Sequence, residues 1–327
     1  MQDGKPMPDS PSISEECLAV SPMIGARLGL AALHRVLDAH RAWLEGLPGG
    51  ERASLNGVTL AEALLDKVNL ERADLKSANF LDAHMSGANL SGASLQFADL
   101  SNATLIDADL SRAELEDAKL EGALLGAANL TEARLARVSL RGANLRQAHL
   151  LEVNIERCDF EGAMLNEARL LQAKVFDCKF TGAKLDGANL YHSVFRCCKM
   201  AEISAAGSNW STALVQNCEF RRADLSSARF DRADLRQSSF WKVTASNANF
   251  QHARLNSTDL EGADLSGARF HEAATMGANF RGADLRAAQG LTQTQLGQAR
   301  TDQQTILPDG SHGPFLLGSG AHRPRRI

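Results

Sequence analysis

The chain has few of the features that mark an enzyme or a membrane protein. Aromatic residues make up only 5% of its 327 residues, and there is a single Tyr. No run of about 18 apolar residues occurs, which is the length needed to span a bilayer. Residues 1–16 are polar and acidic, with no basic region before an apolar stretch, so they do not match a secretory signal. We therefore expect no membrane span and a cytoplasmic location.

Sequence motifs of catalysis are also missing. The chain has no phosphate-binding loop, no dinucleotide-binding glycine pattern, no HExxH and no nucleophile elbow. His34 and His40 lie six residues apart, a spacing that does not place both on one face of a helix. We expect no catalytic, cofactor-binding or metal-binding residue, so the chain is predicted not to be an enzyme and to need no cofactor.

The six cysteines do not have metal-site spacing. Four of them are widely and evenly spaced along the chain, namely Cys158, Cys178, Cys198 and Cys218. Zinc sites need ligands that converge on one point, whereas a buried Cys often serves as a small apolar residue. We expect these four to pack inside the protein and to remain reduced, as in cytosolic proteins. Cys17 and Cys197 are predicted to be the more reactive thiols.

The dominant feature of the chain is a five-residue period. From Leu55 to Leu285 every fifth residue is of one kind, mostly Leu or Phe, over 47 units without an insertion. The residue two positions earlier is small, and Ala occupies 33 of these 47 sites. A period of five fits neither an α-helix nor a β-strand. It indicates a repeat architecture in which each unit buries its apolar residues against its neighbours.

The number of units in one coil follows from a second spacing. Between Cys158 and Cys218 the small site holds Cys at every fourth unit. The large site of the same units holds Phe or Met, at Phe160, Phe180, Met200, Phe220 and Phe240. Similar side chains stack when a coil returns to the same side. Four units are therefore expected in each coil, giving about 12 coils. At about 4.8 Å per coil the rod is roughly 55–60 Å long.

The unit, as in GADLSGARF at 262–270, resembles the repeat of the pentapeptide-repeat family. The resemblance covers residues 53–285. It implies an all-β fold, a right-handed quadrilateral parallel β-helix whose interior holds the central Leu or Phe and the preceding small residue. Function varies widely among members of that family, so the fold alone does not supply it.

The ends of the chain differ from the repeats. We expect a flexible segment at 1–20, a helical cap at 21–50, the β-helix at 51–290, and a C-terminal cap and tail at 291–327. Apolar residues at helical spacing predict the first cap, and Leu291, Leu296 and Ala299 predict a short helix in the second. Each open end of a coil stack exposes unpaired backbone groups and the apolar core, so caps are needed.

Charge is divided unevenly along the rod. Residues 51–132 carry 14 acidic and 6 basic side chains, whereas residues 133–290 carry 17 acidic and 21 basic ones. The candidates for an acidic face are Asp99, Asp107, Asp109, Glu114, Glu116, Asp117 and Glu121. Some members of the resembled family imitate DNA and bind DNA gyrase. The resemblance therefore implies an alternative function, a quinolone-resistance type of gyrase or topoisomerase binder. The other interpretation is an ordinary solvated surface.

Several apolar residues occupy outward positions where most units are polar. The candidate interface residues are Leu151, Leu171, Tyr191, Val194, Leu214 and Phe176. An exposed apolar patch often marks a partner surface, and aromatic anchors are typical of its centre. The alternatives are that the N- or C-terminal segment covers this patch, or that apolar residues are merely tolerated at these positions.

The leading hypothesis is a non-enzymatic scaffold or adaptor, a rigid bacterial rod that binds another protein of unknown identity. An accessory role in a secretion system is compatible with it. We expect no direct binding of nucleic acid. Members of the resembled family often dimerise end to end, so a homodimer remains an option.

Overall fold

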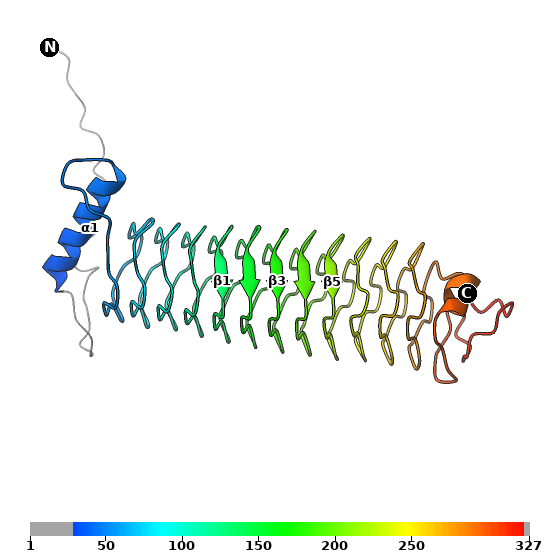
Figure 1. Ribbon diagram of the computed structural model, residues 1–327. Coiled ribbons are helices and arrows are strands. Elements are labelled where there is room, and N and C mark those ends of the chain that lie inside the picture. Colours follow the sequence, from blue (N-terminus) through cyan, green and yellow to red (C-terminus); the bar gives the residue numbers. More distant parts are fainter. Residues whose placement is uncertain (1–28, 324–327) are drawn as a thin grey trace, which may run out of the picture.

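The computed structural model describes residues 29–323, so the segment expected to be flexible at 1–20 lies outside the described residues. The described chain forms a straight rod of stacked coils with a helix at each end (Figure 1). Parallel bridges join the outward residues of each coil to those of the next, from Ser54 and Asp74 to Arg269 and Gln289. One coil therefore contains four five-residue units, as the spacing of the cysteines predicted.

Five short strands lie on one side of the rod and form a single parallel sheet in chain order. They are β1 (Arg134–Ala136), β2 (Asn154–Glu156), β3 (Lys174–Phe176), β4 (Val194–Arg196) and β5 (Leu214–Gln216). The register advances by one whole coil at each step, so that Leu135 pairs with Ile155 and Ile155 with Val175. We call this side of the rod the strand face.

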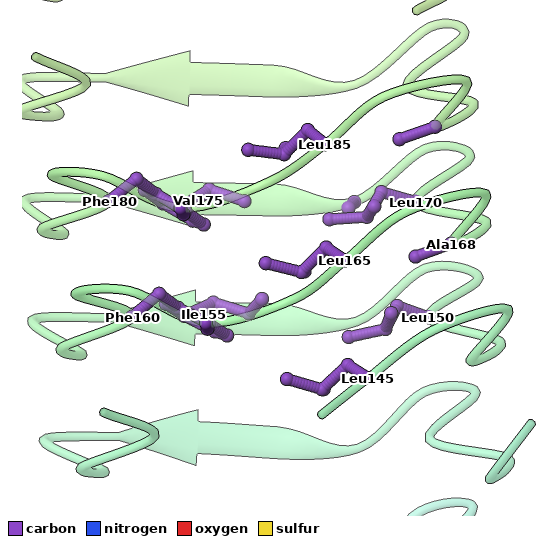
Figure 2. Close-up of a cluster of buried hydrophobic side chains, with 14 of the residues drawn as sticks. Leu145, Leu150, Ile155, Phe160, Leu165, Ala168, Leu170, Val175, Phe180 and Leu185 are labelled. Carbon is purple, nitrogen blue, oxygen red and sulfur yellow. The ribbon is translucent and has the colours of Figure 1, made fainter. Parts of the chain in front are cut away.

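The interior holds one large and one small residue from each unit. Leu55, Leu285 and the alanines between them are buried, as the five-residue pattern predicted. Figure 2 shows the central residues of successive coils stacked on one another, with Phe160 next to Phe180. The rings of these two residues are nearly parallel, with centroids 4.6 Å apart. Stacking of this kind adds to the free energy gained by removing the rings from water.

The Asp or Asn that precedes many of the central Leu and Phe residues has a structural reason. Asn79 Oδ1 accepts a hydrogen bond from the backbone N–H of Leu81, at 2.9 Å, and Asp109 Oδ1 does the same for Ser111. Asn and Asp are suited to this local contact, which stabilises the turn at the corner of the coil. The repeated Asp or Asn of the sequence therefore defines the corners.

Helix α1 (Leu30–Leu44) covers the first coil. Leu33 is fully buried in the core, and Val36 and Leu37 pack against it. His40 is also buried, and its Nδ1 atom accepts a hydrogen bond from the backbone N–H of Ala53, at 3.0 Å. The helix thus supplies both apolar contact and a partner for an open backbone group.

Helix α2 (Gln293–Gln298) covers the last coil. Thr292 and Gln295 form a capping box at its start. Gln295 Nε2 also donates to the carbonyls of Phe270 and Ala273, at 3.1 and 2.8 Å. Beyond the helix, Ile306 still pairs with Asp284 of the rod. The prediction of short helical caps at both ends is confirmed.

Candidate interaction surface

The strand face is the most regular outer surface of the rod. Its outward row has one residue from each coil, the one just before the central residue. These residues are Arg134, Asn154, Lys174, Val194 and Leu214. Parallel pairing holds these residues in one line, at the spacing of neighbouring strands, about 4.8 Å. The row begins with polar side chains and ends with two apolar ones.

Three of the predicted interface residues form a column along one border of this face. The backbone N–H of Glu152 donates to the carbonyl of Leu171, and that of Gln172 donates to the carbonyl of Tyr191, at 3.0 and 3.1 Å. These bonds place Leu151, Leu171 and Tyr191 at the same corner of successive coils. Leu151 is 38% exposed and Tyr191 is 44% exposed, whereas Leu171 is half-buried. We call these three residues the apolar column.

The other three candidates lie on the strand face itself or at its far border. Val194 and Leu214 pair in register between β4 and β5, and both are half-buried. Phe176 ends strand β3 at the opposite border and is also half-buried. The structure therefore places five candidates on the strand face or along one of its borders, beside β2 to β5, and leaves Phe176 across the strand row from the apolar column.

Two shallow grooves follow the rod axis on either side of the outward row. The larger, of about 580 Å³, is lined by Glu132, Arg134, Glu152, Asn154, Gln172, Lys174, His192 and Val194. The smaller, of about 380 Å³, is lined by Arg134, Leu135, Ala136, Asn154, Ile155, Glu156 and Phe176. Both grooves run across several coils, so an elongated segment of a partner fits them better than a small molecule.

The larger groove has carboxylates on one wall and cations on the other. Glu132 and Glu152 stand at the corner, and Arg134 and Lys174 stand on the strand row. A hydrogen bond from Arg112, one coil earlier, holds the pKa of the Glu132 carboxyl below its ordinary range. Glu132 therefore stays ionised at neutral pH, and the groove offers both signs of charge to a ligand.

The predicted acidic residues do not gather on one face. Asp99, Asp109 and Glu114 belong to three different bridge ladders, and Glu116 and Glu121 occupy different corners. They form a band around the rod, which we call the acidic band. The cause is geometric, because residues that are close in sequence point to different sides of a four-sided coil. The band also contains cations, since Arg137 pairs with Asp117 at 2.7 Å.

The cysteine ladder is buried, as predicted. Cys158, Cys178, Cys198 and Cys218 are at most 1% exposed, whereas Cys197 is exposed. The hydrogen bond with Cys158, together with burial, raises the pKa of the Cys178 thiol above its ordinary value. Across residues 29–323, no group of three His, Cys, Asp or Glu side chains is arranged to hold a metal ion.

The polar residues of the two grooves were not singled out by sequence reasoning. One row, Glu132, Glu152, Gln172 and His192, takes one residue from each successive coil, and so does the row Arg134, Asn154 and Lys174. Sorting the sequence by position within the coil assembles both rows. No chemical motif marks them, because outward positions vary freely without affecting the core.

Within the described residues, neither helix has the length and apolar character required to cross a membrane.

Stacked four-sided coils, a filled interior and grooved outer faces define a β-solenoid whose outer surface alone is available for binding. Family models for pentapeptide repeats match this chain over most of the rod. The model for the pentapeptide repeat region matches residues 130–210 and 213–289. The model for eight copies of the pentapeptide repeat matches residues 53–92 and 88–126. The chain belongs to the pentapeptide-repeat family.

Solved structures of the same family are similar to this chain. HetL, a pentapeptide repeat protein involved in heterocyst differentiation regulation in the cyanobacterium Nostoc sp. strain PCC 7120, is 24% identical, with 88% of this chain and all of HetL covered and a TM-score of 0.27. QnrB1, a plasmid-mediated fluoroquinolone resistance protein, is 16% identical, with 70% and 91% covered and a TM-score of 0.23. Rfr23 from the cyanobacterium Cyanothece 51142 is 22% identical, with 39% and 89% covered and a TM-score of 0.23. No curated protein matches the chain significantly.

Proposed function

We propose that this protein is a non-enzymatic binding scaffold that engages a protein partner through its strand face and apolar column. The observation that supports this proposal is the exposure of Leu151 and Tyr191 beside a groove of about 580 Å³. Exposed apolar residues that line up along a groove are typical of partner surfaces. An aromatic ring such as that of Tyr191 supplies a large contact area at a small entropic cost.

The rigidity of the rod favours this role. Along the rod, the outward residue before each central residue is held by parallel bridges to the coils on both sides, and each corner by backbone hydrogen bonds to the next coil. A surface that is already ordered loses little conformational entropy on binding. The partner segment we expect is elongated, lies parallel to the rod axis, and carries apolar side chains together with charges of both signs. The five free cysteines of the described region fit a reducing compartment, so we place the protein in the cytoplasm.

The experiment that tests this proposal is capture of partners from a lysate of the source cells. The immobilised protein is compared with the double variant Leu171→Asp with Tyr191→Asp, which places two charges in the apolar column. The matched control is Ser226→Asp with Ser246→Asp, at outward corner positions on another edge of the rod. We expect the control to retain the partner and the apolar-column variant to lose it.

Thermal unfolding of all three proteins accompanies the capture, because the substituted side chains are outward and the fold is expected to remain intact. If the apolar-column variant retains the same partners as the parent protein, the proposed surface is wrong. Apolar contacts depend weakly on salt, so the captured partner should remain bound at high ionic strength.

The acidic band supports a second candidate function, a DNA-mimicking protein that binds gyrase or topoisomerase. Asp107, Asp109 and Glu121 have no ion pair among the described residues, and residues 51–132 carry 14 acidic and 6 basic side chains. Binding through such a surface should weaken steeply with salt. The same capture experiment separates the two functions, because gyrase or topoisomerase subunits lost at high salt would favour the second.

A further inference from the structure

One edge of the rod, diagonally opposite the apolar column, forms an unbroken line from Glu62 to Lys242. Backbone hydrogen bonds connect its corners coil by coil, for example from Asp82 N to Ser101 O at 3.0 Å and from Arg222 N to Trp241 O at 3.0 Å. Because the coils stack in a straight row, this edge runs from coil to coil along the rod (Figure 1). It spans about nine coil rises, or roughly 43 Å. We call it the charged edge.

Charge is segregated along the charged edge. Glu62 and Asp82 lie at the end near α1, and neither has an ion pair within the described residues. Arg221, Arg222 and Lys242 lie at the other end. Their cationic groups stand 5.1, 5.6 and 4.5 Å from the ring centroid of a single residue, Trp241. Over residues 29–323 this cluster has one acidic neighbour in an ion pair, a distant contact of 3.9 Å from Arg222.

Each corner turn of the charged edge has two residues, such as Arg141 and Gly142. In the middle of the edge the second of these residues is glycine, which has no side chain. Gly122, Gly142, Gly162 and Gly182 follow one another there, one in each coil. Each has a positive φ, which favours glycine, and a Cβ atom added to Gly142, Gly162 or Gly182 would meet nothing within 4 Å, so the space outside these corners is open. Another surface is therefore able to approach the backbone closely between the two charged ends.

We propose that two copies of this protein pair side by side and antiparallel along the charged edge, about a two-fold axis between Gly142 and Gly162. In this arrangement Asp82 of one copy faces Arg222 of the other, and Glu62 faces Lys242. A two-fold axis repeats each contact, so both ends of the edge are neutralised at once. The acidic end thus finds in a second copy the cations that it lacks within its own chain.

The same axis gives complementary contacts at the centre. Arg141 faces Glu161 of the second copy, and these two residues already form an ion pair within one chain, at 2.5 Å. If one copy is moved by one coil along the edge in one direction, Glu161 of one copy faces Glu161 of the other. If it is moved by one coil in the other direction, Asp82 of one copy faces Glu202 of the other. Like charges placed against each other across an interface are unfavourable, so they oppose both shifts. The charge pattern therefore selects the register.

Trp241 provides an apolar contact at each end of the interface. With the axis between Gly142 and Gly162, its half-buried ring faces Ala61 of the second copy, and Leu81, which is 36% exposed, is one coil away. The pairing leaves the apolar column free on the outer side of each copy, because that column occupies the diagonally opposite edge. The dimer would present two such columns, facing away from each other.

Ion pairs at an exposed surface contribute little individually, about 0–1 kcal/mol each. The dimer is therefore expected to be weak and to depend strongly on salt. The test is sedimentation velocity of the full chain over a concentration series at low and at physiological ionic strength. We expect a monomer–dimer equilibrium whose dissociation constant rises with salt.

A charge exchange tests the register. Arg222→Glu alone and Asp82→Arg alone each replace two attractive contacts by repulsive ones, so each is expected to raise the dissociation constant roughly tenfold or more. The double variant Asp82→Arg with Arg222→Glu restores opposite charges at both contacts and is expected to return the dissociation constant close to that of the parent. Arg232→Glu, on the opposite edge, serves as the control and should leave it unchanged.

Three results would overturn the proposal. They are a chain that stays monomeric at low salt, a dimer that is insensitive to Arg222→Glu, and a double variant that fails to recover dimerisation. Partner capture through the apolar column does not depend on any of these results, so this test and that of the proposed function succeed or fail separately.

Discussion

The Sγ atom of Cys158 lies 3.4 Å from the backbone nitrogen of Val138, which stands one coil earlier, and accepts its hydrogen bond. At most other corners this amide donates to the carbonyl three residues before it, as Ala148 N does to Leu145 O at 3.1 Å. The same sulfur lies 3.3 Å from Leu135 O, to which the thiol can donate. The side chain of Cys158 is thus inserted between the donor and the acceptor of the preceding turn.

This insertion explains where the strands occur. Each of the five strands stands one coil before a Cys or Ser at the inward small site, so that β1 precedes Cys158 and β5 precedes Ser238. Ser238 makes the same two contacts, accepting from Cys218 N at 3.1 Å and donating to Val215 O at 3.0 Å. Opening the turn extends the backbone before it, and neighbouring extended segments then pair as the strand face.

The first prediction concerns this inserted thiol. Cys158→Ala removes the acceptor of the Val138 N–H group, which should cost up to about 1–3 kcal/mol, and less if the turn closes onto Leu135 O as it does at other corners. Cys158→Ser retains both contacts and should cost less. Thermal unfolding of the two variants measures the difference, with Cys197→Ala as a control that alters only an exposed thiol. Equal loss of stability in Cys158→Ala and Cys158→Ser would contradict the role given to the hydrogen bond.

The second prediction concerns the stacked rings of the interior. Phe180 is fully buried between Phe160 and Phe195, with ring centroids 4.6 and 6.0 Å away. Phe180→Asp buries an unpaired charge and should prevent the central coils from folding. Phe180→Leu keeps the site apolar and should lower stability by only about 1–3 kcal/mol. Unchanged thermal unfolding of Phe180→Asp would refute the packed four-sided interior.

The third prediction concerns the backbone at the corners. Gly207 has a φ angle of 65°, and an added Cβ there would meet nothing within 4 Å. Gly207→Val is therefore expected to destabilise the rod by about 1–2 kcal/mol through backbone strain alone. Ala206→Val, in the same turn, tests the effect of the larger side chain without that strain. The two variants are compared by denaturant unfolding, and similar losses would indicate that strain is not the cause.

The fourth prediction concerns the pH dependence of the N-terminal cap. Burial lowers the pKa of His40 below its ordinary value of 6.5, so the unfolded chain binds this proton at a higher pH than the folded one. The stability contributed by neutral His40 is present above about pH 6.5 and is lost as the pH falls toward the lowered pKa. Protonation of Nδ1 would also remove the acceptor for Ala53 N–H.

His40→Asn separates this effect from the protonation of carboxylates, which is common to both proteins. Between about pH 7.5 and 5 the melting temperature of the parent should fall more than that of the variant. Amide hydrogen exchange at Ala53 reports the same event locally, because opening of the cap exposes that N–H group. Parallel pH profiles of the two proteins would show that His40 does not titrate with unfolding.

The sequence predicted the solenoid because its period of five assigns each residue to the inside or the outside independently of distant contacts. Even the exchange of large and small residues at Ile203 and Ala205 follows this rule, since both are buried. The six interface candidates were also placed on outward positions by the same rule. The grooves were not predicted, because their walls depend on how far side chains of successive coils extend over one another.

What the sequence determined by itself was the coil, because one large and one small apolar residue in every unit leave only one way to bury both. Tertiary structure decided how charges are grouped. Asp82 and Arg222 are far apart in the sequence but share one straight edge, whereas Glu116 and Glu121 are neighbours that occupy different corners. The physical reason is the four-sided coil, which turns at every unit and returns to the same edge only after four of them. Proximity along the outer surface therefore follows the period of the coil and not the order of the chain.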